Sequence, residues 1–143
     1  MINFIATTTF GIEAIVKREA QNLGFSNISV EDGIVNFTGE LKDIPKANIW
    51  FRSADRILIV MSKFKATTFE ELFQGVKSIN WADFLPKDAN FIVSGKSLKS
   101  TLSSVPACQK ITEKAIVEKL KLTYKGVDYF SKSGNLYKIQ VAL

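Results

Sequence analysis

The sequence contains no histidine and only one cysteine, Cys108. Without histidine the commonest general base is missing, and neither a Ser-His nor a Cys-His catalytic pair can form within the chain. A single cysteine excludes an internal disulfide, and the two shortages together leave no Cys/His metal cluster. We therefore expect this chain to have no catalytic site, metal or cofactor of its own.

Long apolar runs are also missing. No stretch approaches the roughly 18 residues needed to cross a bilayer, and Met1 to Phe10 lacks the basic and apolar segments of a secretory signal. We expect a cytoplasmic protein without a membrane partner. Hydrophobic residues make up 46% of the 143 residues and charged residues 23%. This composition is typical of a globular protein, with a core large enough for one ordinary domain or two small ones.

Positive charge is concentrated in the last third of the chain. The net charge is +5, yet residues 1–94 hold 10 Lys or Arg against 11 acidic residues, and residues 95–143 hold 9 Lys against 3. A one-sided basic region suits a polyanionic partner, because neutralising phosphates releases their counterions. A solvated surface that only promotes solubility is the alternative.

The first 66 residues predict six elements in the order βαββαβ. These are a strand at 2–6, a helix at 12–23, a hairpin at 28–37, a helix at 43–51 and a strand at 56–64. Asp43 is expected to cap the second helix. The last strand has an apolar run too continuous for a half-exposed edge strand. This order is the ferredoxin-like arrangement, an antiparallel sheet with two helices on one face.

A second unit is expected after a boundary at Lys65 to Thr67. Thr68 and Glu71 have the spacing of a capping box. The following elements are a helix with the apolar stripe Phe69, Leu72, Phe73 and Val76, an apolar plug at 81–85, a strand at 91–93, a polar stretch at 94–104, a helix capped by Ser104, and a strand at 137–143. Because the chain stops inside that last strand, we expect it to be a fragment.

Three further residues favour structural roles. We expect Trp50 and Trp81 to pack in the core or between domains, with stacking on nucleic-acid bases as the alternative. Cys108 lies on an apolar helix side, which favours burial over reactivity. Asp55 is expected to pair with one of the arginines at 52 and 56.

Four lysines of the helix after Ser104 share one edge, within an arc of roughly 60°. They are Lys110, Lys114, Lys121 and Lys125, and an apolar face made of Cys108, Ile111, Ala115 and Leu122 adjoins them. Glu118 could pair with Lys114 or Lys121, which would make this edge an ordinary salt-bridged surface. One acid cannot neutralise four bases, so we favour contact with phosphates.

The polar stretch before this helix mixes lysines with hydroxyl groups. Lys96, Ser97, Lys99 and Ser100 could offer ammonium, hydroxyl and backbone N–H groups to phosphates. An ordinary serine-rich connection is the alternative. Gly95-Lys96-Ser97 is no nucleotide-binding P-loop, since the required earlier glycine is missing and the helix starts too late.

Several segments together resemble the N-terminal region of bacterial THUMP-containing RNA methyltransferases. They are residues 4–8 (FIATT), 10–13 (FGIE), 53–56 (SADR), 64–69 (FKATTF) and 93–97 (VSGKS), with Lys99 and Ser100. These enzymes are similar to those that methylate guanine N2 in large-subunit ribosomal RNA, and they are often labelled N6-adenine-specific DNA methylases. Each segment alone would be a weak signal, but together they are fairly specific, and the resemblance extends over essentially all 143 residues.

The resemblance implies an α+β chain: a ferredoxin-like domain at residues 1–66 and a THUMP α/β domain at 67–143 that lacks its last strand. It implies that the chain binds RNA, ribosomal RNA in particular, and delivers it to a downstream methyltransferase domain that uses S-adenosylmethionine. Lys96, Ser97, Lys99 and Ser100 match the family's RNA-contacting loop.

The sequence departs from the complete family pattern, because it has no Gly-rich cofactor loop and no Asn-Pro-Pro-Tyr or Asn-Pro-Pro-Phe motif. Methyl transfer is therefore assigned to no residue here. A protein-interaction module that pairs through its open C-terminal strand is the competing hypothesis.

Overall fold

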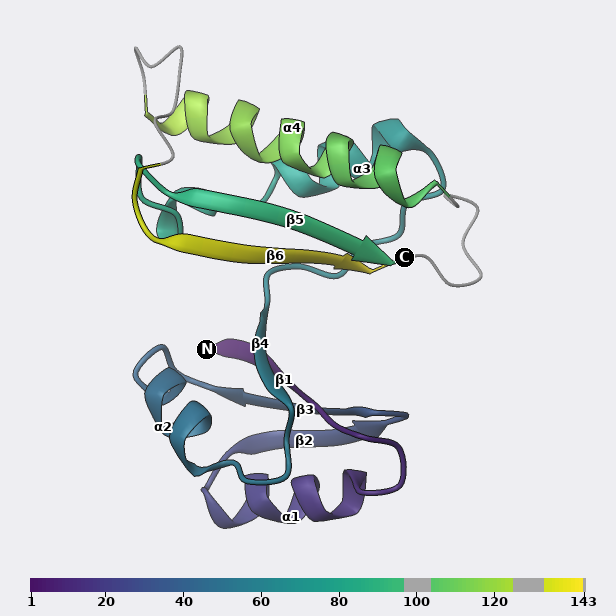
Figure 1. The fold of residues 1–143 in the computed structure, drawn as a ribbon, viewed down its shortest axis with the longest axis vertical. Coiled ribbons are helices and arrows are strands. Elements are labelled where there is room, and N and C mark those ends of the chain that lie inside the picture. Colours follow the sequence, from purple (N-terminus) through teal and green to yellow (C-terminus); the bar gives the residue numbers. More distant parts are fainter. Residues whose placement is uncertain (97–103, 125–132, 143) are drawn as a thin grey trace. The chain divides into compact units, whose positions relative to one another are not determined.

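The computed structural model describes residues 1–96, 104–124 and 133–142. The chain forms two compact units, Met1–Met61 (unit 1) and Ser62–Leu143 (unit 2), and each is described by itself (Figure 1). No helix within the described segments is long and apolar enough to cross a membrane.

Unit 1 is a four-stranded sheet with two helices. Its elements are β1 (Ile2–Thr7), α1 (Glu13–Asn22), β2 (Ser26–Glu31), β3 (Ile34–Gly39), α2 (Asp43–Trp50) and β4 (Arg56–Val60). The strand order is β2-β3-β1-β4, and every neighbouring pair is antiparallel. The predicted βαββαβ order and ferredoxin-like fold are confirmed.

One face of the sheet in unit 1 carries the core. Four side chains that alternate along β1 and β3 are buried, namely Phe4, Ala6, Val35 and Phe37, together with Val16 and Ala20 of α1 and Ala47 of α2. Since both helices contribute to this one cluster, both cover the same face of the sheet. The ring of Phe37 lies 5.2 Å from that of Phe4 and 4.6 Å from that of Phe25, measured between centroids. Small alanines on the helices let them approach this aromatic layer closely.

A carboxylate fastens the loop between β1 and α1 to the β2–β3 hairpin. Glu13 accepts the backbone N–H of Gly11 at 2.9 Å and that of Gly33 at 3.1 Å. Both glycines have positive φ, +100° and +73°, the region that only glycine enters without strain. Backbone N–H groups, its own first and then that of Gly33, hold the pKa of Glu13 below its ordinary value.

Two expectations about the elements of unit 1 are wrong. Asp43 does not cap α2: it is the first helical residue, and its carboxylate instead accepts the N–H of Glu40 at 2.8 Å, which closes the preceding turn. β4 is an edge strand that pairs only with β1, and it ends at Val60 instead of reaching Phe64. Its apolar run is half-buried throughout, so continuous apolar sequence here does not mean a central strand.

Trp50 does not pack in the core of unit 1, and the expectation for Asp55 is wrong. Trp50 is 57% exposed. α2 ends there and the backbone becomes extended at Phe51, whose ring lies in the core at 5.4 Å from Phe37. Among the residues that the structure describes, Asp55 makes no salt bridge to Arg52 or Arg56.

Unit 2 packs two helices on a pair of strands. Its elements are α3 (Phe69–Lys77), the short 3-10 helix η1 (Trp81–Asp83), β5 (Asn90–Lys96), α4 (Val105–Thr123) and β6 (Leu136–Ala142). β5 and β6 are parallel, with Phe91 opposite Tyr137 and Val93 opposite Ile139. α4 packs against α3 and β5, and Figure 1 shows both helices on one side of the strands. The alternation predicted for the last strand is confirmed, because every second side chain of β6 is half-buried.

The capping box and the apolar stripe predicted for α3 are confirmed in part. The Thr68 hydroxyl accepts the N–H of Glu71 at 3.1 Å, as the capping-box pattern predicts, but the Glu71 carboxylate binds Thr67 and not Thr68. In the predicted stripe of α3, Leu72 is buried, whereas Phe69 is 43% exposed because it stands at the first helical position.

The Glu13 clamp generates a pH prediction. Because the folded-state pKa of Glu13 is lowered, the clamp contributes fully above the ordinary glutamate pKa and is lost as the pH falls through the lowered value. We expect hydrogen exchange at the Gly33 amide, corrected for its intrinsic pH dependence, to accelerate across that acidic range. Glu13→Gln, which cannot ionise, should show faster exchange at neutral pH and no such step. The same step in the variant would contradict the clamp.

Candidate nucleic-acid interface

α4 has a regular start and is tied to another segment at its end. At its start, the backbone N–H of Cys108 donates to the carbonyl of Ser104 at 3.0 Å, and Pro106 lies in the first turn. Ser104 is at the capping position, as predicted, although its hydroxyl makes no capping hydrogen bond. At its end, the hydroxyl of Tyr124 donates to the carbonyl of Leu85 at 3.0 Å. The hydrogen bond of Tyr124 therefore ties the end of α4 to the segment that follows η1.

One side of α4 is buried in unit 2. It consists of Cys108, Thr112, Ala115, Ile116 and Leu120, each 2% exposed or less. The predicted apolar face was rotated from this one, since Ile111 is half-buried and Leu122 is 60% exposed. Packing on α3 and β5 selects the side that includes Thr112, a polar residue that hydrophobicity alone would leave outside.

The opposite side of α4 carries the lysines. Lys110, Lys114 and Lys121 are all exposed, and their helical positions fall within about 40° of one another. Thr112, in the middle of the buried side, lies about 160° from Lys110. The three ammonium groups thus leave the helix in one direction, as the sequence predicted. We call Lys110, Lys114 and Lys121 the lysine ridge.

No salt bridge joins the lysine ridge to a carboxylate within the segments that the structure describes. Glu118 forms no salt bridge with Lys114 or Lys121, so the salt-bridged alternative for this surface is wrong. Three uncompensated charges on one helix edge attract a polyanion and repel one another weakly in solvent.

The Gly-Lys-Ser segment begins in a strand and not in a loop. β5 continues through Ser94 and Gly95 to Lys96, which is opposite Ala142 of β6, so the expected polar connection from residue 94 is wrong at its start. A Cβ on Gly95 would lie 3.0 Å from Cγ1 of Val141 and 3.4 Å from Cγ of Gln109. Glycine at this position therefore suits the close approach of α4 and β6.

Several predicted site residues fall outside what the structure describes. These are Ser97, Lys99, Ser100 and Lys125, together with the side chain of Lys96. Their assignment to RNA contact stays a prediction. Lys96 is the last residue of β5. This end of the strand lies close to the start of α4, because Gly95 is near Gln109.

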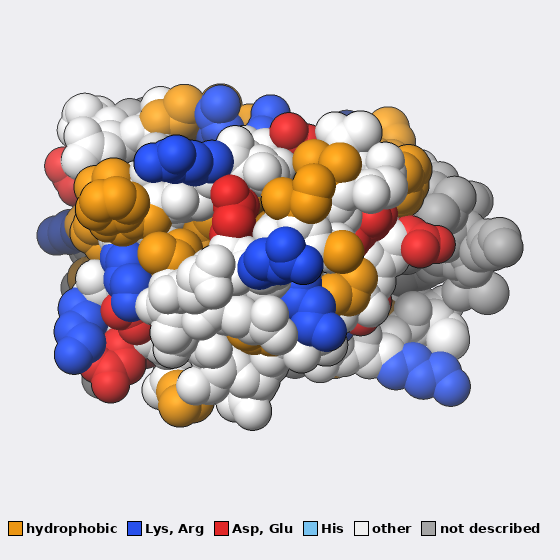
Figure 2. Space-filling model, turned by 90° about the horizontal axis from the view of Figure 1, so that it is seen from below, with side chains coloured by type: hydrophobic (Ala, Val, Ile, Leu, Met, Phe, Trp, Pro, Cys, Tyr) orange, Lys and Arg blue, Asp and Glu red, His pale blue; other side chains and the backbone are white. Residues whose placement is uncertain are grey.

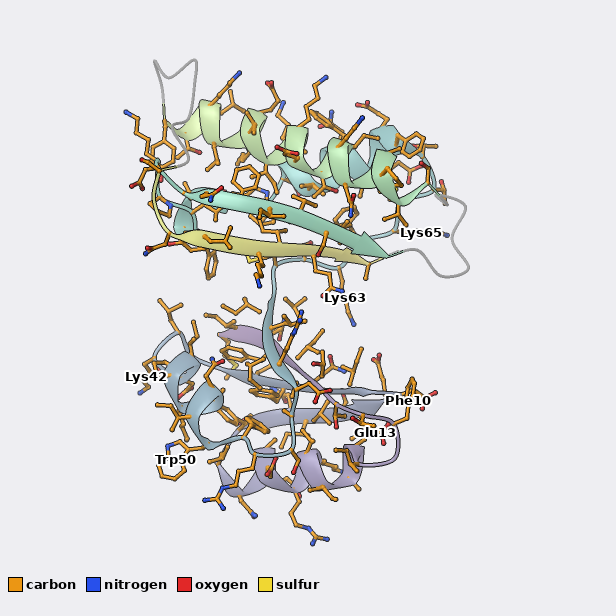
Figure 3. The ribbon with its side chains drawn as sticks, viewed as in Figure 1. Phe10, Glu13, Lys42, Trp50, Lys63 and Lys65 are labelled. Atoms are coloured by element: carbon orange, nitrogen blue, oxygen red, sulfur yellow. The ribbon has the colours of Figure 1, made fainter. Side chains whose placement is uncertain are left out.

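Two exposed lysines that the sequence analysis did not single out belong to unit 2. Lys63 and Lys65, which Figure 3 labels, flank Phe64 in the sequence. The ring of Phe64 fills the space beside Gly75 of α3. Counted by unit, unit 2 has 13 Lys against 7 acidic residues, and unit 1 has 6 Lys or Arg against 7. Figure 2, which views the face where α1 lies, shows basic, acidic and hydrophobic side chains interspersed. The positive excess is therefore a property of unit 2.

The remaining reactive group is inert. Cys108 is 1% exposed, and burial raises the pKa of its thiol, as expected for a structural cysteine. Within residues 1–96, 104–124 and 133–142, no group of three Cys, Asp or Glu side chains could hold a metal ion.

Comparison with known families is decisive. Residues 66–141, more than half of the chain, match the model of the THUMP domain. The chain belongs to the THUMP domain family. Residues 3–58 match the model of the RlmL ferredoxin-like domain, which corresponds to the fold of unit 1.

Relatives of this THUMP protein carry methyltransferase or methylase names. It is 49% identical over 140 residues to a Bacillus subtilis protein named "Putative RNA methyltransferase YpsC", covering 97% of this chain and 36% of that protein. A "predicted N6-adenine-specific DNA methylase" of Listeria monocytogenes superposes with a TM-score of 0.94 at 47% identity, over 99% of this chain and 37% of the other. SMU.472, "a putative methyltransferase complexed with SAH", gives 0.93 at 45% identity, over 99% and 38%. The chain thus spans about a third of each relative's length.

The buried side of α4 gives a stability prediction. The hydroxyl of Thr112 is buried and has no hydrogen-bond partner within the described residues. Because burying an unpaired hydroxyl costs about 1–3 kcal/mol, Thr112→Val should stabilise the protein by about 1 kcal/mol and raise the melting temperature by about 4–8 °C.

Thr123→Val is the matched control for this prediction. Thr123 is exposed on the same helix, and its hydroxyl donates to the carbonyl of Lys119 at 3.2 Å. This change should give no gain. A lower melting temperature for Thr112→Val would mean that another side of α4 is buried.

Proposed function

We propose that this chain binds structured RNA, ribosomal RNA in particular, and presents it to a methyltransferase domain outside the 143 residues. The observation that carries the proposal is the lysine ridge of α4, which projects uncompensated charge from the THUMP unit. The names of the relatives support it, because they are methyltransferases of which this chain matches about a third.

The chemistry of the ridge suits the phosphate backbone. Structured RNA is recognised mainly through its shape, phosphates and 2′-hydroxyls, since its deep major groove is closed to side chains. Three ammonium groups along one edge of a helix, one and then two turns apart, follow a phosphate backbone without reading its sequence. The choice of base, guanine N2 in this proposal, then belongs to the methyltransferase domain.

The cofactor belongs to the same absent domain. One relative is complexed with SAH, and we infer that S-adenosylmethionine is the methyl donor of the parent enzyme. This chain offers no catalytic residue for that step, so its role is to bind RNA and hold it in place.

The proposal predicts the salt dependence of RNA binding. Each lysine that neutralises a phosphate contributes nearly one unit to the slope of log K against log salt concentration. Replacing Lys110, Lys114 and Lys121 with glutamine should therefore reduce that slope by about 2–3 and weaken binding at low salt. Fluorescence anisotropy with a labelled ribosomal RNA hairpin, at several salt concentrations, measures both effects.

The control variant carries the same loss of charge in unit 1, at Lys17, Arg18 and Arg56, which are also exposed. It should keep the slope and the affinity. Both variants should melt like the wild type, because none of the six side chains is buried or in a salt bridge. An unchanged slope in the ridge variant would overturn the proposed RNA contact.

Strand pairing is the second candidate function. β6 has a strand neighbour, β5, on one edge, and the described part of unit 2 has no third strand. Pairing of a partner's strand with the free edge would rest on backbone hydrogen bonds, which respond little to salt. Binding of a protein partner that persists unchanged as salt rises would favour this function over the first.

A further inference from the structure

A tryptophan stands exposed at the end of α2. Trp50 is 57% exposed, whereas Trp81 is buried and donates its indole N–H to the carbonyl of Val76 at 2.9 Å. Figure 3 shows Trp50 pointing away from the body of unit 1. Burying a large apolar side chain contributes about 1.5–3 kcal/mol relative to leaving it in water. An exposed indole therefore favours contact with a ligand or partner.

The backbone that carries Trp50 is held in place. Phe51, the next residue, is in the core, and Glu19 of α1 accepts the N–H groups of Arg52 and Ser53 at 3.3 and 3.2 Å. The platform is therefore preorganised on rigid elements, so little ordering entropy would be lost when a ligand stacks on it.

Cations lie on both sides of the indole along the chain. Lys46 is one helical turn before Trp50, at the spacing that brings side chains together, and Arg52 is exposed two residues after it. The ammonium of Lys46 lies 5.1 Å from the ring centroid of Phe25. Within the described residues, neither the ammonium group of Lys46 nor the guanidinium group of Arg52 forms a salt bridge.

We propose that Trp50, with Lys46 and Arg52, binds an unpaired nucleotide of the RNA: the base stacks on the indole and the cations contact the adjacent phosphates. An exposed aromatic ring with cations near it along the chain is a combination that binds single-stranded nucleic acid. The charge complementarity favours RNA over a protein partner, which would need acidic groups opposite Lys46 and Arg52. This inference rests on the proposed function and extends it, because the lysine ridge alone holds backbone and no base.

The test compares two forms of one labelled ribosomal RNA hairpin, blunt-ended or extended by an unpaired oligoadenylate of about 12 nucleotides. The wild-type chain should bind the extended form more tightly. Trp50→Ala should weaken binding of the extended form by about 5- to 100-fold and leave the blunt form unchanged. Trp50→Phe, which keeps a ring, should retain most of the affinity.

Intrinsic fluorescence gives a second readout. The extended hairpin should quench the indole of Trp50, and Trp50→Phe should abolish that quenching, since Trp81 is buried. Ile49→Ala is the matched control, because Ile49 is 69% exposed on the same helix and carries no π-face. It should behave like the wild type in both assays.

The outcomes separate this inference from the proposed function. If neither hairpin binds, the RNA-binding function itself fails. If both bind with equal affinity and Trp50→Ala changes nothing, RNA binding stands and the role of Trp50 is overturned. An equal loss for both hairpins, or an equal loss with Ile49→Ala, would also overturn stacking.

Discussion

The burial of one side of α4 is the constraint on which the rest of the account depends. Ile116 and Leu120 are almost fully buried on that side, and each contributes about 1.5–3 kcal/mol by leaving water. Because a helix cannot turn about its axis without exposing them, Lys110, Lys114 and Lys121 must face solvent together. Packing in the core of unit 2 thereby sets the direction of the charge on its surface, and the positive excess of the sequence becomes a directed feature of one helix.

Sequence patterns predicted the helices, strands and turns well wherever the residues that determine them lie within a few positions of one another along the chain. The hairpin at Gly33, the cap at Thr68 and the alternation of β6 all depend on neighbours along the chain, and all are present. The phase of the lysines was predictable for the same reason, since helical geometry alone sets it. The family resemblance was confirmed by matches to the ferredoxin-like and THUMP models.

Tertiary packing decided what the sequence could not. Whether Trp50 or Phe51 enters the core depends on where α2 ends, which no local pattern marks. β4 reads as a central strand, yet its position at the sheet edge follows from the pairing order of four strands. The buried side of α4 includes Thr112 because α3 and β5 lie there, so hydrophobicity placed that side incorrectly. The continuation of β5 through Gly95 likewise depends on its partner β6, remote in sequence.

Unit 1 and unit 2 thus divide their contributions: the first offers a rigid fold with one exposed indole, and the second carries the excess of lysine. The most direct measurement of the central claim is lysine footprinting, in which exposed amines are acetylated with and without a ribosomal RNA hairpin and read by mass spectrometry. The account predicts that RNA protects Lys110, Lys114 and Lys121 while Lys17 and Lys42 of unit 1 react as before. Equal reactivity of the three ridge lysines with and without saturating RNA would contradict it.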